Sequence, residues 1–155
     1  MLQKLVAAAA ATTLVVLSAC SDDGPRTLAR GEDVDLVGPG PLGDQTIDIT
    51  AEQEGGEVTG EVRFDPHGAV ASFQCADTDS DGVVRLGGQW TSVPTHSDSL
   101  AVGDWMAVVI HEGDPDRVAS YLSDPGTESC AAVIEQVPDD IETLEVEAGD
   151  DIETG

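Results

Sequence analysis

The strongest constraint on the fold is an alternation of apolar and polar residues with a period of two. Ile47 and Ile49 alternate with polar neighbours, and Val58, Val62 and Phe64 do the same further along the chain. Successive side chains of a β-strand point to opposite faces of a sheet. The period therefore predicts half-buried strands rather than helices.

The same pattern continues through the middle of the chain, where turn signals rich in Gly, Pro and Asp separate the segments. We expect further strands over residues 69–75, 84–90, 100–102 and 105–110. The last of these is a continuous apolar run, typical of a central strand. Roughly five or six strands with short turns predict a mainly β fold, a small antiparallel meander that closes as a barrel or folds as a sandwich.

Composition divides the chain into four parts. Residues 1–19 are expected to be a signal peptide, and residues 20–45 a lipidated Cys followed by a flexible linker rich in Gly, Pro and Asp. Residues 46–137 are expected to form the β domain. Residues 138–155 carry eight acids and no base, so we expect an extended, disordered acidic tail. A tail that binds a partner as a transient helix is the alternative.

The N-terminal segment has the features of an export signal. Lys4 precedes an uncharged and largely apolar run over residues 5–17, which is too short to span a bilayer as a mature helix. The run ends in Leu17-Ser18-Ala19-Cys20, which resembles the lipobox of bacterial lipoproteins. That resemblance implies cleavage before Cys20 and acylation of its sulfur. Two or three acyl chains anchor a protein stably, whereas one chain binds only marginally.

Assigning Cys20 to lipid leaves Cys75 and Cys130 as a pair. Two such thiols outside the cytoplasm are expected to oxidise to a disulfide. A redox or nucleophilic thiol is the alternative, but the chain has no Cys-x-x-Cys motif. The segment that carries Cys130 is expected to form a short helix capped by Ser129, and a last strand is the alternative.

One motif indicates a metal site. Asp77, Asp79 and Asp81, followed by Gly82, form the D-x-D-x-D-G pattern that opens a calcium loop. The twelfth position of such a loop should be Glu but is Gly88, and the flanking segments are predicted strands. Asp-Gly is also the sequence of a tight hairpin turn. A polar hairpin tip therefore stands as the alternative to calcium, and we expect no other cofactor.

Other catalytic and binding patterns are weak. The three histidines have no metal-ligand spacing, although a zinc site assembled in space stays open, and neither a G-x-S-x-G nor a phosphate-binding glycine loop occurs. Trp90 and Trp105 could line the mouth of a ligand site, but a small barrel also needs large side chains to fill its core. We expect no catalytic residue and no enzymatic activity.

Charge excludes one class of partner. The chain has 6 basic and 31 acidic residues, a formal charge of −25. Nucleic-acid binding depends on basic patches, and none occurs here. Attraction to anionic lipids likewise requires polybasic segments, so any membrane attachment depends on the acyl chains at Cys20.

Motifs of the predicted β domain have a loose likeness elsewhere. Residues 58–130 contain a strand ending in Phe-x-Cys, an Asp-Gly turn, a Gly-Gly-x-Trp strand and a late Cys. This order is similar to small secreted domains of uncharacterised Gram-positive envelope proteins, and the resemblance implies a β fold without an activity.

We expect a monomeric lipoprotein on the extracytoplasmic face of the cell membrane, acting as a non-catalytic binding or accessory module with an envelope protein as its partner. A barrel that carries a small apolar ligand, a calcium-binding envelope domain and an enzyme are the alternatives.

Overall fold

The computed structural model describes residues 24–39 and 43–155. The predicted signal peptide and Cys20 lie outside these residues. Eight strands and one helix follow in the order β1 (Arg26–Val37), β2 (Gln45–Glu54), β3 (Glu57–Asp65), β4 (Ala69–Thr78), β5 (Val84–Ser92), β6 (Trp105–His111), β7 (Arg117–Leu122), α1 (Cys130–Gln136) and β8 (Leu144–Val146). Within the described residues, no helix is long and apolar enough to cross a membrane.

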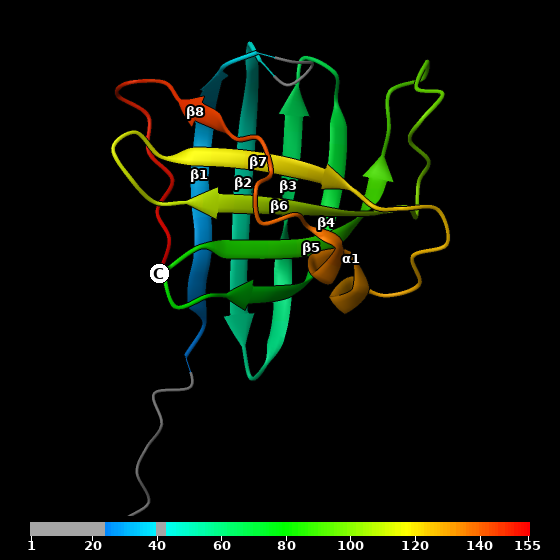
Figure 1. Cartoon of the computed structure of the whole chain (residues 1–155), viewed down its shortest axis with the longest axis horizontal. Coiled ribbons are helices and arrows are strands. Elements are labelled where there is room, and N and C mark those ends of the chain that lie inside the picture. Colours follow the sequence, from blue (N-terminus) through cyan, green and yellow to red (C-terminus); the bar gives the residue numbers. More distant parts are fainter. Residues whose placement is uncertain (1–23, 40–42) are drawn as a thin grey trace, which may run out of the picture.

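The strands form a closed antiparallel barrel in which each strand pairs with the next and β8 pairs with β1. This confirms the prediction of a mainly β meander and selects the barrel over the sandwich. In Figure 1, β5, β6 and β7 cross in front of β1, β2 and β3. Because neighbouring strands alternate in direction, β1, β3, β5 and β7 end where β2, β4 and β6 begin. We call this end the Trp90 end, and the opposite one the Arg26 end.

The alternating residues fill the barrel, as the sequence predicts. The side chains of Ile47, Ile49, Val62 and Leu86 are fully buried, and Trp90 is 4% exposed. One cluster of apolar side chains runs through the interior. Burial of each such aliphatic side chain contributes about 1.5–3 kcal/mol to the free energy of folding.

A second apolar layer lies outside the barrel wall. Ala107 and Val109 alternate with the inward-facing residues of β6, yet they too are buried, as is Val133 of α1. The helix packs against β4, β5 and β6. This layer explains why residues 105–110 are apolar at every position. Ser129 accepts a hydrogen bond from the Ala132 backbone N–H and caps the helix, as predicted.

The predicted flexible linker is wrong over residues 26–37, because Arg26–Val37 is the first barrel strand. The register of β1 against β2 shifts between Thr27 and Ala29 and again between Gly31 and Val34. Each shift is a bulge that adds a residue and breaks the period of two. The strand therefore lacks the alternation by which the other strands were found.

The predicted disordered tail is also wrong as a description of residues 138–155. β8 lies between β1 and β7 and completes the barrel, and its Leu144 and Val146 are buried. Further on, Ile152 is 1% exposed, and Glu153 exchanges two backbone hydrogen bonds of 2.9 Å with Arg30. The C-terminal segment, red in Figure 1, thus runs beside β1. The β domain extends beyond the predicted bounds of 46–137 at both ends.

Two finer predictions also change. Residues 100–102 form part of a loop and turn, not a strand, and Val102 is 64% exposed. In β4 the register shifts between Phe73 and Cys75, so Phe73 points into the core whereas Cys75 is directed to the outside. Strict alternation along residues 69–75 would place both residues on one face, and a bulge cannot be recognised from alternation alone.

Candidate functional site

The predicted disulfide is present. Cys75 and Cys130 are joined by an S–S bond of 2.02 Å, with their Cα atoms 6.0 Å apart. The bond ties α1 to the outer face of β4 and passes over Gly87 of β5. A Cβ atom at Gly87 would lie 2.7 Å from the Cys130 sulfur and 2.8 Å from the Cys75 sulfur. The absence of a side chain at position 87 is therefore what makes room for the disulfide.

The structure favours the hairpin alternative for the predicted calcium loop. Asp79 Oδ1 accepts hydrogen bonds from the backbone N–H groups of Val83 and Asp81, and Asp79 Oδ2 lies 3.2 Å from the Arg85 guanidinium. The hydrogen bond from Val83, with those from Asp81 and Arg85, lowers the pKa of Asp79. Arg85 also lies 3.8 Å from Asp77. Asp79 thus holds the turn together with donors that belong to the protein.

Another acidic group comes from distant parts of the chain. Asp35, Glu147 and Asp150 place one carboxylate oxygen each within 4.8 Å of the others, and all three side chains are exposed. Asp35 accepts a hydrogen bond from the Thr46 hydroxyl, and its backbone N–H donates to Asp150. These bonds attach the C-terminal segment to β1 and account for the cluster. Among the described residues, no comparable group includes any of the three histidines.

A second carboxyl pair holds the C-terminal segment at the Arg26 end. Asp116 is 8% exposed, and its two oxygens accept hydrogen bonds from the backbone N–H groups of Gly113 and Ile152. Asp151 lies beside it. A hydrogen bond with the Asp116 carboxyl raises the pKa of Asp151, and desolvation and repulsion by Asp116 and Glu153 act in the same direction.

This raised pKa predicts how stability depends on pH. The folded chain holds a proton on Asp151 more tightly than the unfolded chain does. The stabilisation by that proton is complete below about pH 4, which is the ordinary pKa of an Asp side chain in an unfolded chain. It is lost as the pH rises through the higher pKa of the folded chain. Asp151→Asn keeps a donor for Asp116 without the charge, so it should raise Tm at pH 7 by a few degrees and flatten the dependence of Tm on pH. Thermal unfolding from pH 4 to 8 measures both.

Asp140→Asn is the matched control, because it removes the same charge from an exposed side chain of the same segment. If Asp140→Asn raised Tm at pH 7 as much as Asp151→Asn, general charge repulsion would explain the gain, and the pairing with Asp116 would not.

An apolar hollow lies at the Trp90 end. It has a volume of about 400 Å³ and lies among the ends of several strands. Its lining residues are Gln45, Phe64, His67, Ala69, Trp90, Pro94, Ser99, Leu100, Ser120 and Leu122. Ligand pockets commonly have such a size and an apolar lining with a few polar groups. We call this hollow the Trp90 pocket.

Trp90 has two roles in this arrangement. Its ring packs on Phe64, with ring centroids 5.8 Å apart, so it fills the core as one interpretation of the sequence predicts. It also lines the pocket, as the other interpretation predicts. Its indole Nε1 is buried and has no hydrogen-bond partner in the described part of the chain. A buried N–H without an acceptor costs about 1–3 kcal/mol, and an acceptor on a bound ligand would recover part of that cost.

Of the pocket residues, only Trp90 was a candidate in the sequence, and two of the others lie on a strand that was not predicted. Ser120 and Leu122 belong to β7, for which no strand was predicted after the apolar run of β6. The signal was present, because Val118, Ser120 and Leu122 alternate with Ala119 and Tyr121. The strand has only six residues. Its alternation is therefore too short to stand out from the neighbouring loops.

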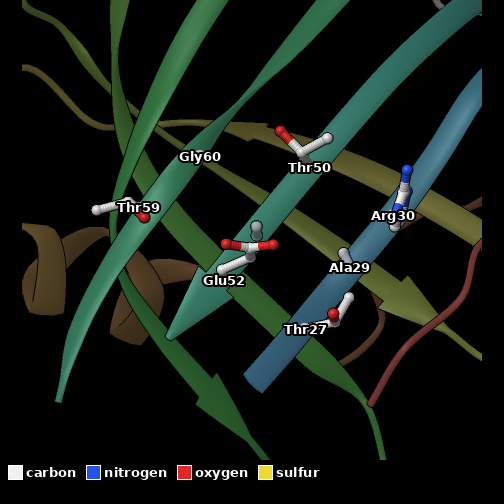
Figure 2. Close-up of a pocket in the computed structure, with 8 residues that line it drawn as sticks. Thr27, Ala29, Arg30, Thr50, Glu52, Thr59 and Gly60 are labelled. Carbon is white, nitrogen blue, oxygen red and sulfur yellow. The ribbon is translucent and has the colours of Figure 1, made fainter. Parts of the chain in front are cut away.

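A polar hollow of about 330 Å³ lies on the outer wall near the Arg26 end. Figure 2 shows Thr27 and Arg30 of β1, Thr50 and Glu52 of β2, and Thr59 of β3 around it. It forms where β3 lies very close to β2, since a Cβ atom at Gly60 would lie 2.0 Å from the Thr50 carbonyl oxygen. We therefore interpret this hollow as a result of the close approach of β2 and β3, and we assign no ligand to it.

Comparison of the chain with known protein families, curated proteins and solved structures gives no match.

Proposed function

We propose that this protein is a non-catalytic binding module of the cell envelope, held at the extracytoplasmic face of the membrane by acyl chains on Cys20, and that it binds its partner at the Trp90 end. The observation that carries the proposal is the apolar Trp90 pocket, whose lining includes Trp90, a residue with a buried indole N–H that has no partner among the described residues. An apolar hollow with one buried donor selects a partner that offers an apolar group beside a hydrogen-bond acceptor.

The position of the pocket supports the orientation. β1 begins with Arg26 at one end of the barrel, and the pocket lies at the other end. A chain attached through Cys20 would therefore direct the Trp90 pocket away from the lipid. This placement favours a partner in the envelope over a lipid taken from the bilayer beneath.

The structure gives less support to a barrel that carries a small ligand in its interior. Interior positions along the barrel are occupied by fully buried side chains, among them Ile47, Met106 and Ile110. Small barrels of this kind are filled by their own side chains. The space for a ligand lies at the end of the barrel instead.

Site-specific photocrosslinking in the cells that produce the protein tests the proposal. A benzophenone amino acid in place of Leu122, which is 46% exposed at the pocket, should give discrete adducts in the membrane fraction. The control is the same substitution at Glu57, which is exposed at the Arg26 end. Adducts from both positions alike, or none from position 122, would contradict binding at the Trp90 end.

Cys20→Ser should move the protein out of the membrane fraction, and an unchanged distribution would contradict the anchor.

A further inference from the structure

The strand pairing that closes the barrel is short beside the Trp90 pocket. β8 pairs with β7 only at Arg117 and Val118, whereas β7 continues to Leu122. The last part of β7 therefore has β6 on one side and no strand partner on the other, within the described residues.

The hydrogen-bond pattern shows which backbone groups face this gap. The Asp116 carbonyl accepts from Val146 on the β8 side, and Ser123 N–H donates to Trp105 on the β6 side. Alternate residues of an antiparallel strand bond to opposite neighbours. The N–H and C=O groups of Ser120 and Leu122 therefore lie on the same edge of β7 as the Asp116 carbonyl, and beyond the end of β8 they face the gap.

The gap and the pocket are adjacent, because Ser120 and Leu122 also line the Trp90 pocket. A strand placed along β7 would have alternate side chains directed toward the pocket. An unpaired edge beside an apolar pocket is the arrangement by which several domains bind peptides, with the edge providing affinity and the pocket providing specificity.

We propose that the partner is an extended peptide segment that pairs with β7 at Ser120 and Leu122 and inserts one apolar side chain into the Trp90 pocket. This inference rests on the proposed function and specifies its ligand. The formal charge of −25 disfavours an acidic segment, so the peptide is neutral or basic.

The probes are blocked pentapeptides, acetyl-Lys-Val-Xaa-Val-Lys-amide, in which the central residue is Phe, Leu, Val or Trp. They are added to the mature chain with Cys20→Ser, and binding is followed by NMR. At least one peptide should slow hydrogen exchange of the Ser120 and Leu122 amides and shift the Trp90 indole signal. A peptide with Glu in place of both Lys residues should bind at least tenfold more weakly.

N-methylation identifies edge pairing, because alternate amides of a strand lie on opposite edges. Methylating one alternate set of peptide amides should weaken binding at least tenfold, and methylating the other set should have little effect. Equal effects of the two sets would overturn the inference.

Two variants of the protein provide the matched comparison. Leu122→Ala shortens the pocket side chain and keeps the backbone N–H. Leu122→Pro also removes that N–H, which does not bond to β6, and an edge strand tolerates proline there. Peptide binding should fall at least tenfold further in Leu122→Pro than in Leu122→Ala, while the remaining amide signals show that both variants stay folded.

The inference and the proposed function fail in different ways. If the peptides shift only the Trp90 indole and leave the Ser120 and Leu122 amides unchanged, the pocket binds an apolar group without strand pairing, and the inference is wrong while the proposed function stands. If no peptide shifts either signal, the inference is wrong, and the crosslinks from position 122 decide the proposed function separately.

Discussion

A chain that ends at Val137 should fail to form the barrel. This truncation removes β8, the strand through which β1 meets β7, together with the buried side chains of Leu144, Val146 and Ile152. Each contributes about 1.5–3 kcal/mol through burial, while the net stability of a small domain is only about 5–15 kcal/mol. The truncated chain should lose its cooperative thermal transition and expose its amides to rapid hydrogen exchange.

The control separates the loss of buried residues from the loss of charge. Asp139→Asn, Asp140→Asn and Glu142→Gln together remove three charges from exposed side chains of the same segment. This triple variant should keep the Tm of the parent within a few degrees or raise it. A cooperative transition that survived the truncation would show that the barrel does not depend on β8.

Removing the disulfide should have the second largest effect. Cys75 and Cys130 are 55 residues apart, and the chain-entropy model gives about 4 kcal/mol for closing a loop of this length. The double variant Cys75→Ser, Cys130→Ser should therefore lose much of its stability. Urea unfolding at pH 7 measures the change in the free energy of unfolding.

Reduction of the native chain gives an independent measurement. It should lower the urea midpoint in the same direction as the double variant, and both thiols should then become alkylated upon unfolding. The parent chain without reductant is the control for both measurements. A midpoint unchanged by reduction and by the double substitution would refute the stabilising role of the bond.

The alternation of residues 46–110 was enough to predict an antiparallel β meander, though not to choose the barrel over the sandwich, because most of these strands are regular and have one buried face. Ile47, Ile49 and Val62 occupy the predicted face. The disulfide could be predicted by pairing the two remaining thiols, and the cap at Ser129 follows from the chemistry of its hydroxyl.

The remaining errors have physical causes. Bulges break the period of two in β1, and β8 is only three residues long among many acids. Both strands are fixed by pairing with distant residues, as at Leu36 and Val146, and such pairing cannot be recognised within a local window. The Trp90 pocket combines parts of β2, β3, β4, β5 and β7 with a loop, so it depends on the closed barrel and has no motif of its own.

The early start of β1 determines how far the domain can reach. Only five residues separate Cys20 from Arg26, and fully extended they span at most about 20 Å. With Cys20 acylated, the Arg26 end would stay close to the lipid headgroups. The Trp90 end would rise no more than about 60 Å above them, since the 12 residues of β1 add about 3.3 Å each. A partner would then have to come to the membrane surface, because this domain has no stalk with which to extend outward.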